Sequence, residues 1–307
     1  MKATYIDRHG GPDVLTYGDL PDPDANAGQV VVDIHAASVN AADSKVRSGV
    51  GATIENFPYV LGRDFSGIVS ALGTGLTDLS VGDTVFGVCQ VGQEGAYAEK
   101  IAVESAILAP KPDQFSHVAA AALAAAGLTA LISIEDTLRL QRDETILIQG
   151  GAGGVGGLAV QLAKSIAARV ITTASAANHE YLYDLGADEV IDYNTTDFTE
   201  VVSDCDAVFD TVGGTVADRS FAVLRPGGRA AFIASGPSAP IPVRNDVVSL
   251  RPIVARDRPH LERIIDLVAR GTIRIPEITT FPLADAAAAH RISEKRHLRG
   301  KLVLTVR

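Results

Sequence analysis

The chain has 307 residues, of which 27 are basic and 37 acidic, so its net charge is −10 with histidines neutral. Hydrophobic residues make up 47% of it, enough for a sizeable core in two domains or one large one. The acidic balance disfavours nucleic acid or an anionic membrane surface as the main partner, because phosphate binding needs a concentrated basic face. Two cysteines, Cys89 and Cys205, indicate reduced, intracellular usage, so we expect a cytoplasmic protein in which both thiols fill apolar space.

The first part of the chain reads as many short strands separated by glycine and proline. β-rich runs occur at 2–6, 30–35, 67–70 and 83–88. An alanine-rich apolar stretch follows at 118–132. We interpret it as a buried pair of helices rather than a membrane span, because it contains Gly127 and other small residues.

Strand and helix patterns alternate from about residue 113 to 255. Strands are predicted at 144–149, 169–174, 189–193, 206–211 and 229–234, with helices at 155–168 and 178–185 among them. This alternation predicts a parallel, doubly wound α/β sheet. An amphipathic helix at 259–270 and a strand at 301–306 follow, and the strand is expected to return to the first domain. We therefore predict one domain from 1–112 and 256–307, and a second from 113–255.

A glycine loop joins the first strand of the alternating region to its first helix. Residues 151–156 fit G-x-G-x-x-G after an apolar run and before a helical one. Glycines let the backbone turn tightly and approach a pyrophosphate, which the N–H groups and dipole of the helix N-terminus attract. The pattern favours a dinucleotide site over a glycine-rich turn of no further role.

The end of the next strand bears on which dinucleotide binds. Sites for NAD carry a carboxylate about 20 residues after the glycine loop, at the end of the second strand, which binds the ribose 2′-hydroxyl. Here that strand end carries Ser175 and Asn178, and the first acid, Glu180, already lies on the next helix. Ser175 and Asn178 could donate hydrogen bonds to a 2′-phosphate, each worth about 1.5–3 kcal/mol, or could merely cap the helix. We expect NADPH rather than NADH.

Five further motifs, together with the glycine loop, carry a resemblance to a known family. They are Ser38–Gly49, Leu61–Val69, Val81–Gly87, Gly95–Glu99 and Ala126–Ala130. In this order, and with the glycine loop, the chain resembles a medium-chain dehydrogenase/reductase over nearly its full length. It is most similar to the zinc-independent branch of quinone oxidoreductases and alkenal (enone) reductases. The resemblance implies a GroES-like, partly open β-barrel catalytic domain and a Rossmann domain, with the active site between them.

The resemblance also indicates that no metal takes part. Zinc-dependent relatives have a cysteine where this chain has Asn40, and His-Glu where it has Arg63 and Asp64. Catalytic zinc needs three good ligands, which this set does not supply. Without a Lewis acid, a quinone or α,β-unsaturated carbonyl is an easier hydride acceptor than an isolated ketone. The site then needs one or two hydrogen-bond donors for the developing oxyanion.

By resemblance, Asn40 and Lys45 are the catalytic candidates, because their segment lines the nicotinamide side of the site. Asn40 could instead stabilise a turn, and Lys45 could be a solvated surface lysine. Asp43 is expected to cap the short helix that starts there, rather than to orient Lys45. Some close relatives carry tyrosines at the positions of Lys45 and Gly51, so their substrate contacts do not transfer.

The remaining cofactor contacts are also implied by resemblance. Thr129 would lie beside the nicotinamide, and Tyr193 near the adenine or its phosphate. Arg296 would reach the 2′-phosphate, or would be one charge in a solvated run. The full predicted cofactor set is Thr129, Gly151, Gly153, Gly154, Val155, Ser175, Asn178, Tyr193, Thr211, Val212, Ser235, Gly236 and Arg296.

These observations favour an NADPH-dependent, metal-free reductase of small-molecule quinones or enones. An acyl-thioester enoyl reductase and a non-catalytic NADPH-binding redox sensor remain alternatives. The last strand of the Rossmann sheet, expected near 247–254, could pair with its mate across a two-fold axis, so we expect a homodimer. Arg251 and Pro252 would limit that pairing.

Overall fold

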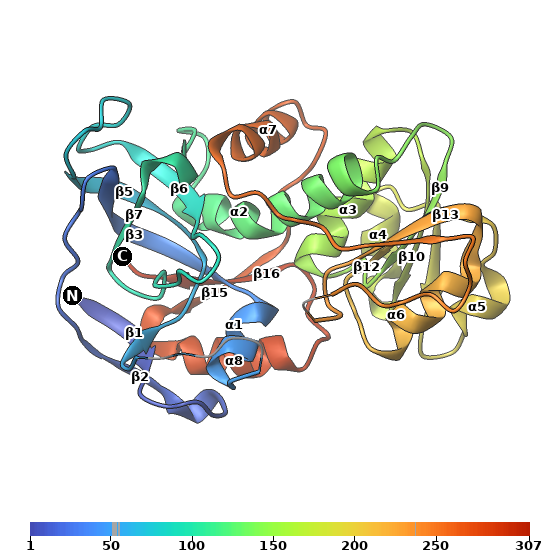
Figure 1. Ribbon diagram of the computed structural model, residues 1–307, viewed down its shortest axis with the longest axis horizontal. Coiled ribbons are helices and arrows are strands. Elements are labelled where there is room, and N and C mark those ends of the chain that lie inside the picture. Colours follow the sequence, from blue (N-terminus) through green and yellow to red (C-terminus); the bar gives the residue numbers. More distant parts are fainter. Residues whose placement is uncertain (51–53, 55, 237) are drawn as a thin grey trace. The chain divides into compact units, whose positions relative to one another are not determined.

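The computed structural model describes residues 1–50, 54, 56–236 and 238–307. The chain forms two compact units, which are described separately. The first unit comprises residues 1–125, 256–266 and 277–307, and the second comprises 126–255 and 267–276 (Figure 1).

Antiparallel strands dominate the first unit. Its larger sheet has the order β15-β16-β3-β5-β6-β8, with β7 paired to β3, and a small sheet has the order β2-β1-β4. The strands are β1 (Lys2–Ile6), β2 (Leu15–Asp19), β3 (Gln29–Val39), β4 (Tyr59–Val60), β5 (Asp64–Leu72), β6 (Thr84–Val88), β7 (Lys100–Glu104), β8 (Leu108–Pro110), β15 (Ile278–Pro282) and β16 (Lys301–Thr305). The predicted return of the C-terminal strand to this unit is confirmed, because β16 pairs with β3.

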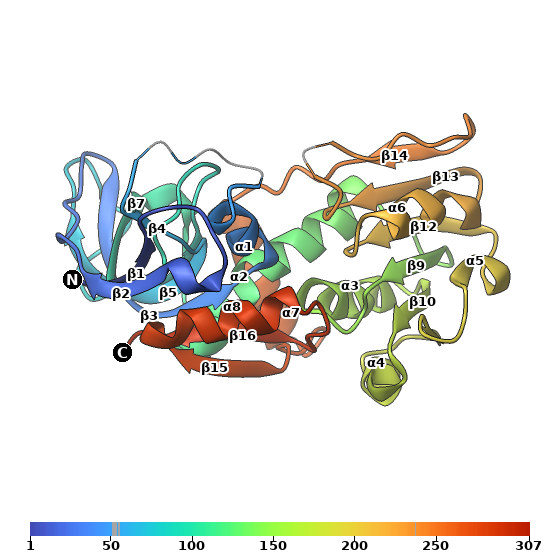
Figure 2. The same cartoon turned by 90° about the horizontal axis from the view of Figure 1, so that it is seen from below.

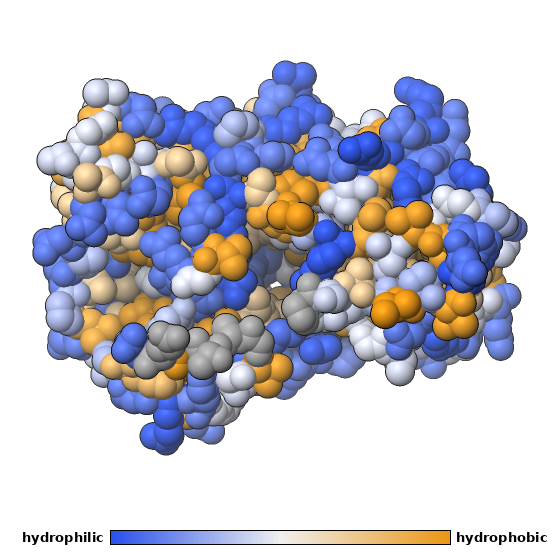
Figure 3. Space-filling view, viewed as in Figure 1, coloured by the Kyte–Doolittle hydropathy of each residue, from blue (hydrophilic) through white to orange (hydrophobic). Residues whose placement is uncertain are grey.

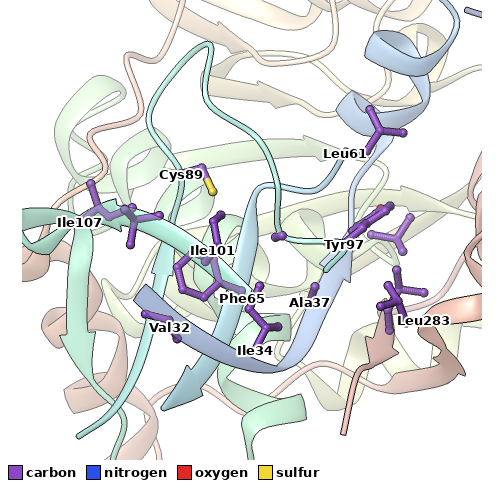
Figure 4. Packing of buried hydrophobic residues seen from close by; sticks show 14 of the residues in the cluster. Val32, Ile34, Ala37, Leu61, Phe65, Cys89, Tyr97, Ile101, Ile107 and Leu283 are labelled. Carbon is purple, nitrogen blue, oxygen red and sulfur yellow. The ribbon is translucent and has the colours of Figure 1, made fainter. Parts of the chain in front are cut away.

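The core of the first unit lies between these strands. Side chains of β3, including Val32 and Ile34, belong to one buried cluster with Phe65 of β5 and Ile101 of β7 (Figure 4). Cys89 belongs to the same cluster, which confirms its predicted role as an apolar filler. Each fully buried aliphatic or aromatic side chain of this kind contributes roughly 1.5–3 kcal/mol to folding.

A parallel six-stranded sheet forms the second unit, in the order β11-β10-β9-β12-β13-β14. Its strands are β9 (Thr145–Gln149), β10 (Arg169–Ala174), β11 (Glu189–Asp192), β12 (Cys205–Asp210), β13 (Leu224–Phe232) and β14 (Val248–Leu250). Helices cover both faces (Figure 2), so the central strand β9 is apolar and buried almost throughout. Strand order reverses between β9 and β12, which is where the carboxyl ends of such sheets bind ligands.

Eight α-helices occur in the described part of the chain. They are α1 (Ala41–Arg47), α2 (His117–Leu131), α3 (Gly154–Ser165), α4 (His179–Asp184), α5 (Phe198–Val201), α6 (Thr215–Ser220), α7 (Arg258–Ala269) and α8 (Ala286–Glu294). The chain order of strands and helices within the second unit follows the predicted alternation.

The predicted helix pair at 118–132 is wrong. The stretch forms the single helix α2, which continues as a π-helical segment at Ile132–Thr137. Gly127 does not break it, because one buried glycine costs a helix only about 1 kcal/mol and the flanking side chains are packed. His117–Thr137 is long and apolar enough to cross a membrane by length and composition, but 72% of its most apolar 18-residue window is buried within the protein, as expected for a core helix.

The last strand of the parallel sheet is shorter than predicted. β14 covers only Val248–Leu250 and pairs with β13. Arg251 turns its guanidinium to the carbonyl of Phe232 at 2.7 Å, and Pro252 has no N–H to donate to a ladder. The segment 251–254 therefore leaves the sheet.

Candidate functional site

The glycine loop lies between β9 and α3, as predicted. A Cβ on Gly156 would come within 2.2 Å of the Gly150 carbonyl oxygen, so the close packing of helix against strand requires glycine there. A Cβ on Gly153 would meet only that same oxygen, at 3.5 Å, so the space in front of Gly153 is open. Gly153 is the N-cap of α3, whose first N–H groups have no acceptor within the helix. An open, N–H-lined loop of this kind fits a pyrophosphate.

Polar side chains without a carboxylate follow β10. The Asn178 amide donates to Oγ of Ser175 at 3.1 Å, and both residues are partly exposed. Tyr193 follows the neighbouring strand β11, and its N–H bonds weakly to the carbonyl of Ala174 at 3.4 Å. Ser175, Asn178 and Tyr193 therefore share one edge of the sheet, where their hydroxyl and amide groups suit a ribose phosphate.

The ends of β12 and β13 complete this edge. Thr211 donates its hydroxyl to the Gln149 carbonyl at 2.7 Å. The carboxylate of Asp210 accepts from the N–H groups of Val212 at 2.6 Å and Gly213 at 2.9 Å, which shapes the turn. The hydroxyl oxygen of Ser235 is buried and has no hydrogen-bond partner in the described part of the chain, so it can serve a ligand.

Three residues at this edge escaped the sequence reasoning. Thr173 donates its hydroxyl to the Gln149 side chain at 2.8 Å and accepts from the N–H of Gly150 at 3.1 Å. With Thr173 and Gln149, the third residue is Asp210, and burial raises the pKa of its carboxyl. A polar residue that ends an otherwise apolar strand is the signal that could have found all three. They hold the loop and the turn in place rather than facing the open side.

Asn40 stands at the centre of a buried polar network in the first unit. Its amide nitrogen donates to Oδ1 of Asp64 at 2.7 Å, and its amide oxygen accepts from Nζ of Lys301 at 2.8 Å. A second contact of the amide nitrogen, to the Ser38 carbonyl, is long at 3.5 Å. Burial lowers the pKa of Lys301, which also donates to the Val39 carbonyl at 3.0 Å. The side chain of Asn40 is thus fixed in orientation.

Asp43 caps the start of α1, as predicted. Its Oδ2 accepts from the N–H of Asn40 at 2.8 Å and from the hydroxyl of Tyr97 at 2.8 Å. Its other oxygen, Oδ1, has no hydrogen-bond partner among the described residues and lies 3.7 Å from Nε of Arg63. Burial raises the pKa of Asp43 to about 6, although the nearby Arg63 opposes the shift.

Arg63 lies between two carboxyl groups. Its guanidinium contacts Oε1 of Glu94 at 2.9 Å and 3.1 Å, through Nη2 and Nε. Burial raises the pKa of Glu94 to about 7, with a further contribution from the charge of Asp43. Asn40, Arg63 and Asp64, the positions at which the resemblance implies zinc ligands in zinc-dependent relatives, belong to one network here. In the described ranges, no group of three or more His, Cys, Asp or Glu side chains could hold a metal ion.

A second arm of this network was also missed. The hydroxyl of Tyr97 lies 3.2 Å from Nε2 of His290, and Nδ1 of His290 accepts from Arg47 at 2.9 Å. Arg47 in turn pairs with Glu294. Burial and the charge of Arg47 lower the pKa of His290 to about 3, so this histidine is neutral. Arg47 and Glu294 are 247 positions apart in sequence, so no local sequence pattern predicts their contact.

The predicted site residues therefore fall into two sets. Those at the glycine loop and at the ends of β10 to β13 share one edge of the second unit. Asn40 and Lys45 belong to the first unit, where Lys45 lies in α1 and is half-buried. Arg296 also belongs to the first unit, just after α8, with a left-handed φ of 56°. Gly51 lies outside the described residues. The roles of all the predicted site residues, Lys45, Thr129 and Arg296 included, stay predictions.

Two family models match the chain. One, described as an alcohol dehydrogenase GroES-like domain, matches residues 26–113, and one described as zinc-binding dehydrogenase matches 185–304. The NADPH-dependent alkenal/one oxidoreductase of Arabidopsis thaliana chloroplasts is 32% identical over 99% of this chain and 79% of its own length. The chain belongs to the medium-chain dehydrogenase/reductase family.

Solved structures agree with this family, and quinone oxidoreductases are among them. The quinone oxidoreductase from Coxiella burnetii is 35% identical, with a TM-score of 0.92 over 100% of this chain and 99% of that one. The Escherichia coli quinone oxidoreductase complexed with NADPH is 28% identical, with a TM-score of 0.91 over 100% of both chains. The predicted fold class, a Rossmann sheet with a GroES-like domain, is confirmed.

Proposed function

We propose that this protein is an NADPH-dependent, metal-free reductase that transfers hydride to quinones or α,β-unsaturated carbonyl compounds. Full-length similarity to quinone and alkenal oxidoreductases supports the reaction class. The observation that carries the cofactor choice is the edge of the second unit. There, an open glycine loop lies beside a strand end that carries Ser175 and Asn178 rather than a carboxylate. We also assign residues 1–112 and 256–307 to catalysis, and residues 113–255 to cofactor binding.

The residues at this edge fit the dinucleotide. The N–H groups around Gly153, Gly154 and Val155 would hold its pyrophosphate, while Ser175 and Asn178 would donate to the 2′-phosphate. Thr211, Val212, Ser235 and Gly236 would line the nicotinamide half with Thr129, while Tyr193 and Arg296 would act on the adenosine half. When bound, NADPH supplies the hydride. The loop backbone, which Thr173 holds at Gly150, would orient the cofactor.

Asn40 and Lys45 would stabilise the oxygen of the acceptor as negative charge develops on it. One hydrogen of the Asn40 amide is committed to Asp64 at 2.7 Å, but the other makes only the 3.5 Å contact to Ser38. A contact of that length is barely a hydrogen bond, so an acceptor oxygen can replace it. Lys301 and Asp64 hold the amide in orientation, and removing one such donor typically costs on the order of 10²–10³ in turnover.

The test is NADPH consumption by the purified, chelator-treated protein against a panel of quinones and short enones, with NADH in parallel. Turnover with NADPH, weak turnover with NADH and no effect of the chelator would support the proposal. Tight NADPH binding without consumption would favour a redox sensor or a specialised acyl-thioester substrate. Loss of turnover on chelation would contradict the metal-free mechanism.

We also propose a cytoplasmic homodimer. The two cysteines are both buried free thiols, which suits a reducing compartment. Ile241, Val243, Val248 and Ile253, on and beside the edge strand β14, expose their apolar side chains. Figure 3 shows apolar side chains gathered on the face over which this segment runs in Figure 1. Light scattering should give twice the chain mass for the wild type and a monomer for Val248→Lys, since a charge on an edge strand opposes pairing.

A further inference from the structure

Arg251, which directly follows β14 in the second unit, carries a positive charge that no carboxylate within 4.0 Å balances in the described part of the chain. Its Nη1 donates to the carbonyl of Phe232, the last residue of β13, at 2.7 Å. A guanidinium has five N–H donors, and the other four have no acceptor among the described residues. The residue is half-buried, so a full charge with free donors is held partly out of water.

Other arginines of the same unit are paired. Arg229 contacts Glu144 at 2.6 Å, and Arg244 contacts Asp246 at 2.6 Å. For Arg251, burial alone lowers the pKa, and no neighbouring charge of either sign contributes. A guanidinium stays protonated at neutral pH in proteins, so this charge is positive whenever the protein is folded.

The place of this charge on the sheet determines what it can act on. Strand order switches between β9 and β12, so a dinucleotide bound there has its pyrophosphate at the loop after β9 and one half on either side. Ser175 and Asn178 follow β10 and would take the adenosine half, which leaves the ends of β12 and β13 to the nicotinamide half. The guanidinium of Arg251 lies at the end of β13, on the nicotinamide side.

Asp210 is an acid at the same edge, and it does not neutralise Arg251. It ends β12 in register with Phe232, and it is fully buried. Its Oδ1 accepts from the N–H groups of Val212 at 2.6 Å and Gly213 at 2.9 Å, so this carboxyl belongs to the turn after β12. Arg251 is not among the groups that shift the pKa of Asp210, as expected if the two charges are well separated.

We infer that Arg251 makes the site discriminate between the two redox states of the cofactor, so that it holds NADPH more tightly than NADP⁺. The nicotinamide ring is neutral in NADPH and carries one positive charge in NADP⁺, while the phosphates of the two are the same. At the effective dielectric constant of about 20 near a protein surface, two cations repel each other about four times as strongly as in bulk water. The ring becomes positive only when the hydride has left, so the repulsion favours release of the oxidised product. This inference rests on the proposed function and extends it to the redox state of the bound cofactor.

The test measures the Kd of NADPH and of NADP⁺ separately, without any acceptor, by nicotinamide fluorescence and by calorimetric titration. The ratio of the NADP⁺ Kd to the NADPH Kd should fall about three- to tenfold in Arg251→Gln, because the repulsion of the oxidised ring is removed. Arg251→Met, also uncharged, must give the same fall. Arg251→Lys keeps the charge and should stay within about twofold of the wild-type ratio. Arg244→Gln is the matched control, because Arg244 loses the same charge but already pairs with Asp246 at 2.6 Å.

Each outcome bears on the inference. A wild-type ratio in Arg251→Gln and Arg251→Met, with both cofactors still bound, would overturn the inference and leave the reductase intact. Equal rises in both Kd values would assign the guanidinium to a cofactor phosphate, and the same fall in Arg251→Lys would assign the effect to shape rather than charge; either would also overturn it. If the wild-type protein bound neither cofactor, the proposed function would fail and this inference with it.

Discussion

Gly156→Ala should damage both folding and cofactor binding. The new Cβ would lie 2.2 Å from the Gly150 carbonyl oxygen and 2.9 Å from the Cα of Gly151, both backbone atoms of the phosphate loop. The helix and the loop must therefore separate. Forcing an extra methyl into a packed site costs about 1–3 kcal/mol. For a unit of this size, that corresponds to a fall in Tm of roughly 3–10 °C. We expect the Kd of NADPH to rise at least tenfold with it.

Gly153→Ala is the matched control. Gly153 has φ −71° and ψ 165°, which alanine adopts freely, and its Cβ would meet only the Gly150 oxygen at 3.5 Å. Its Tm should stay within about 1 °C of the wild type, yet NADPH should bind more weakly because the methyl group enters the expected phosphate position.

Scanning fluorimetry gives Tm for both variants. The chain has no tryptophan, so the fluorescence of the reduced nicotinamide reports binding directly. Wild-type NADPH affinity in Gly153→Ala would refute the placement of the phosphate over this loop. An unchanged Tm in Gly156→Ala would refute the close approach of helix and strand.

Three further predictions test other parts of the structure. Ser175→Asp should raise the Kd of NADPH about 10- to 100-fold and leave that of NADH nearly unchanged, because a carboxylate repels the 2′-phosphate; equal changes for both cofactors would argue against this position. His290 has a folded-state pKa of about 3, below its ordinary value, so its stabilising contribution is complete above about pH 6.5 and is lost as the pH falls toward 3. Urea unfolding at several pH values should therefore show a shallower acid loss in His290→Gln, and parallel curves would contradict the neutral, buried ring. Lys301→Met leaves the Val39 carbonyl and the Asn40 amide oxygen without their donor, so the free energy of unfolding should fall by about 1–3 kcal/mol, with kcat lower as the amide loosens; a wild-type kcat would remove Lys301 from the positioning of Asn40.

The features that the sequence predicts best are those with short-range signals. The glycine loop, the alternating strands of the second unit and the cap formed by Asp43 each depend on residues a few positions apart. The polar edge built by Gln149 and Thr173 needs the strand order as well, because its members come from neighbouring parallel strands. Sequence spacing does not give that order.

Long-range contacts account for most of what was missed. Lys301 reaches Asn40 across 261 positions, through the pairing of β16 with β3. The prediction errors at α2 and β14 have a related cause. Gly127 is tolerated because its surroundings are packed, and β14 stops early because Arg251 finds an acceptor on the adjacent strand.

The burial of the two thiols, Cys89 and Cys205, bears on their reactivity toward the proposed acceptors. Quinones and enones are electrophiles that alkylate thiolates, so a reductase of such compounds risks being inactivated by its own substrates. Only the thiolate reacts, and burial raises the pKa of Cys89 well above its usual range and that of Cys205 to about 12. Both are closed off within apolar clusters, and the sequence contains no other cysteine. We therefore expect both thiols to resist alkylation by such acceptors.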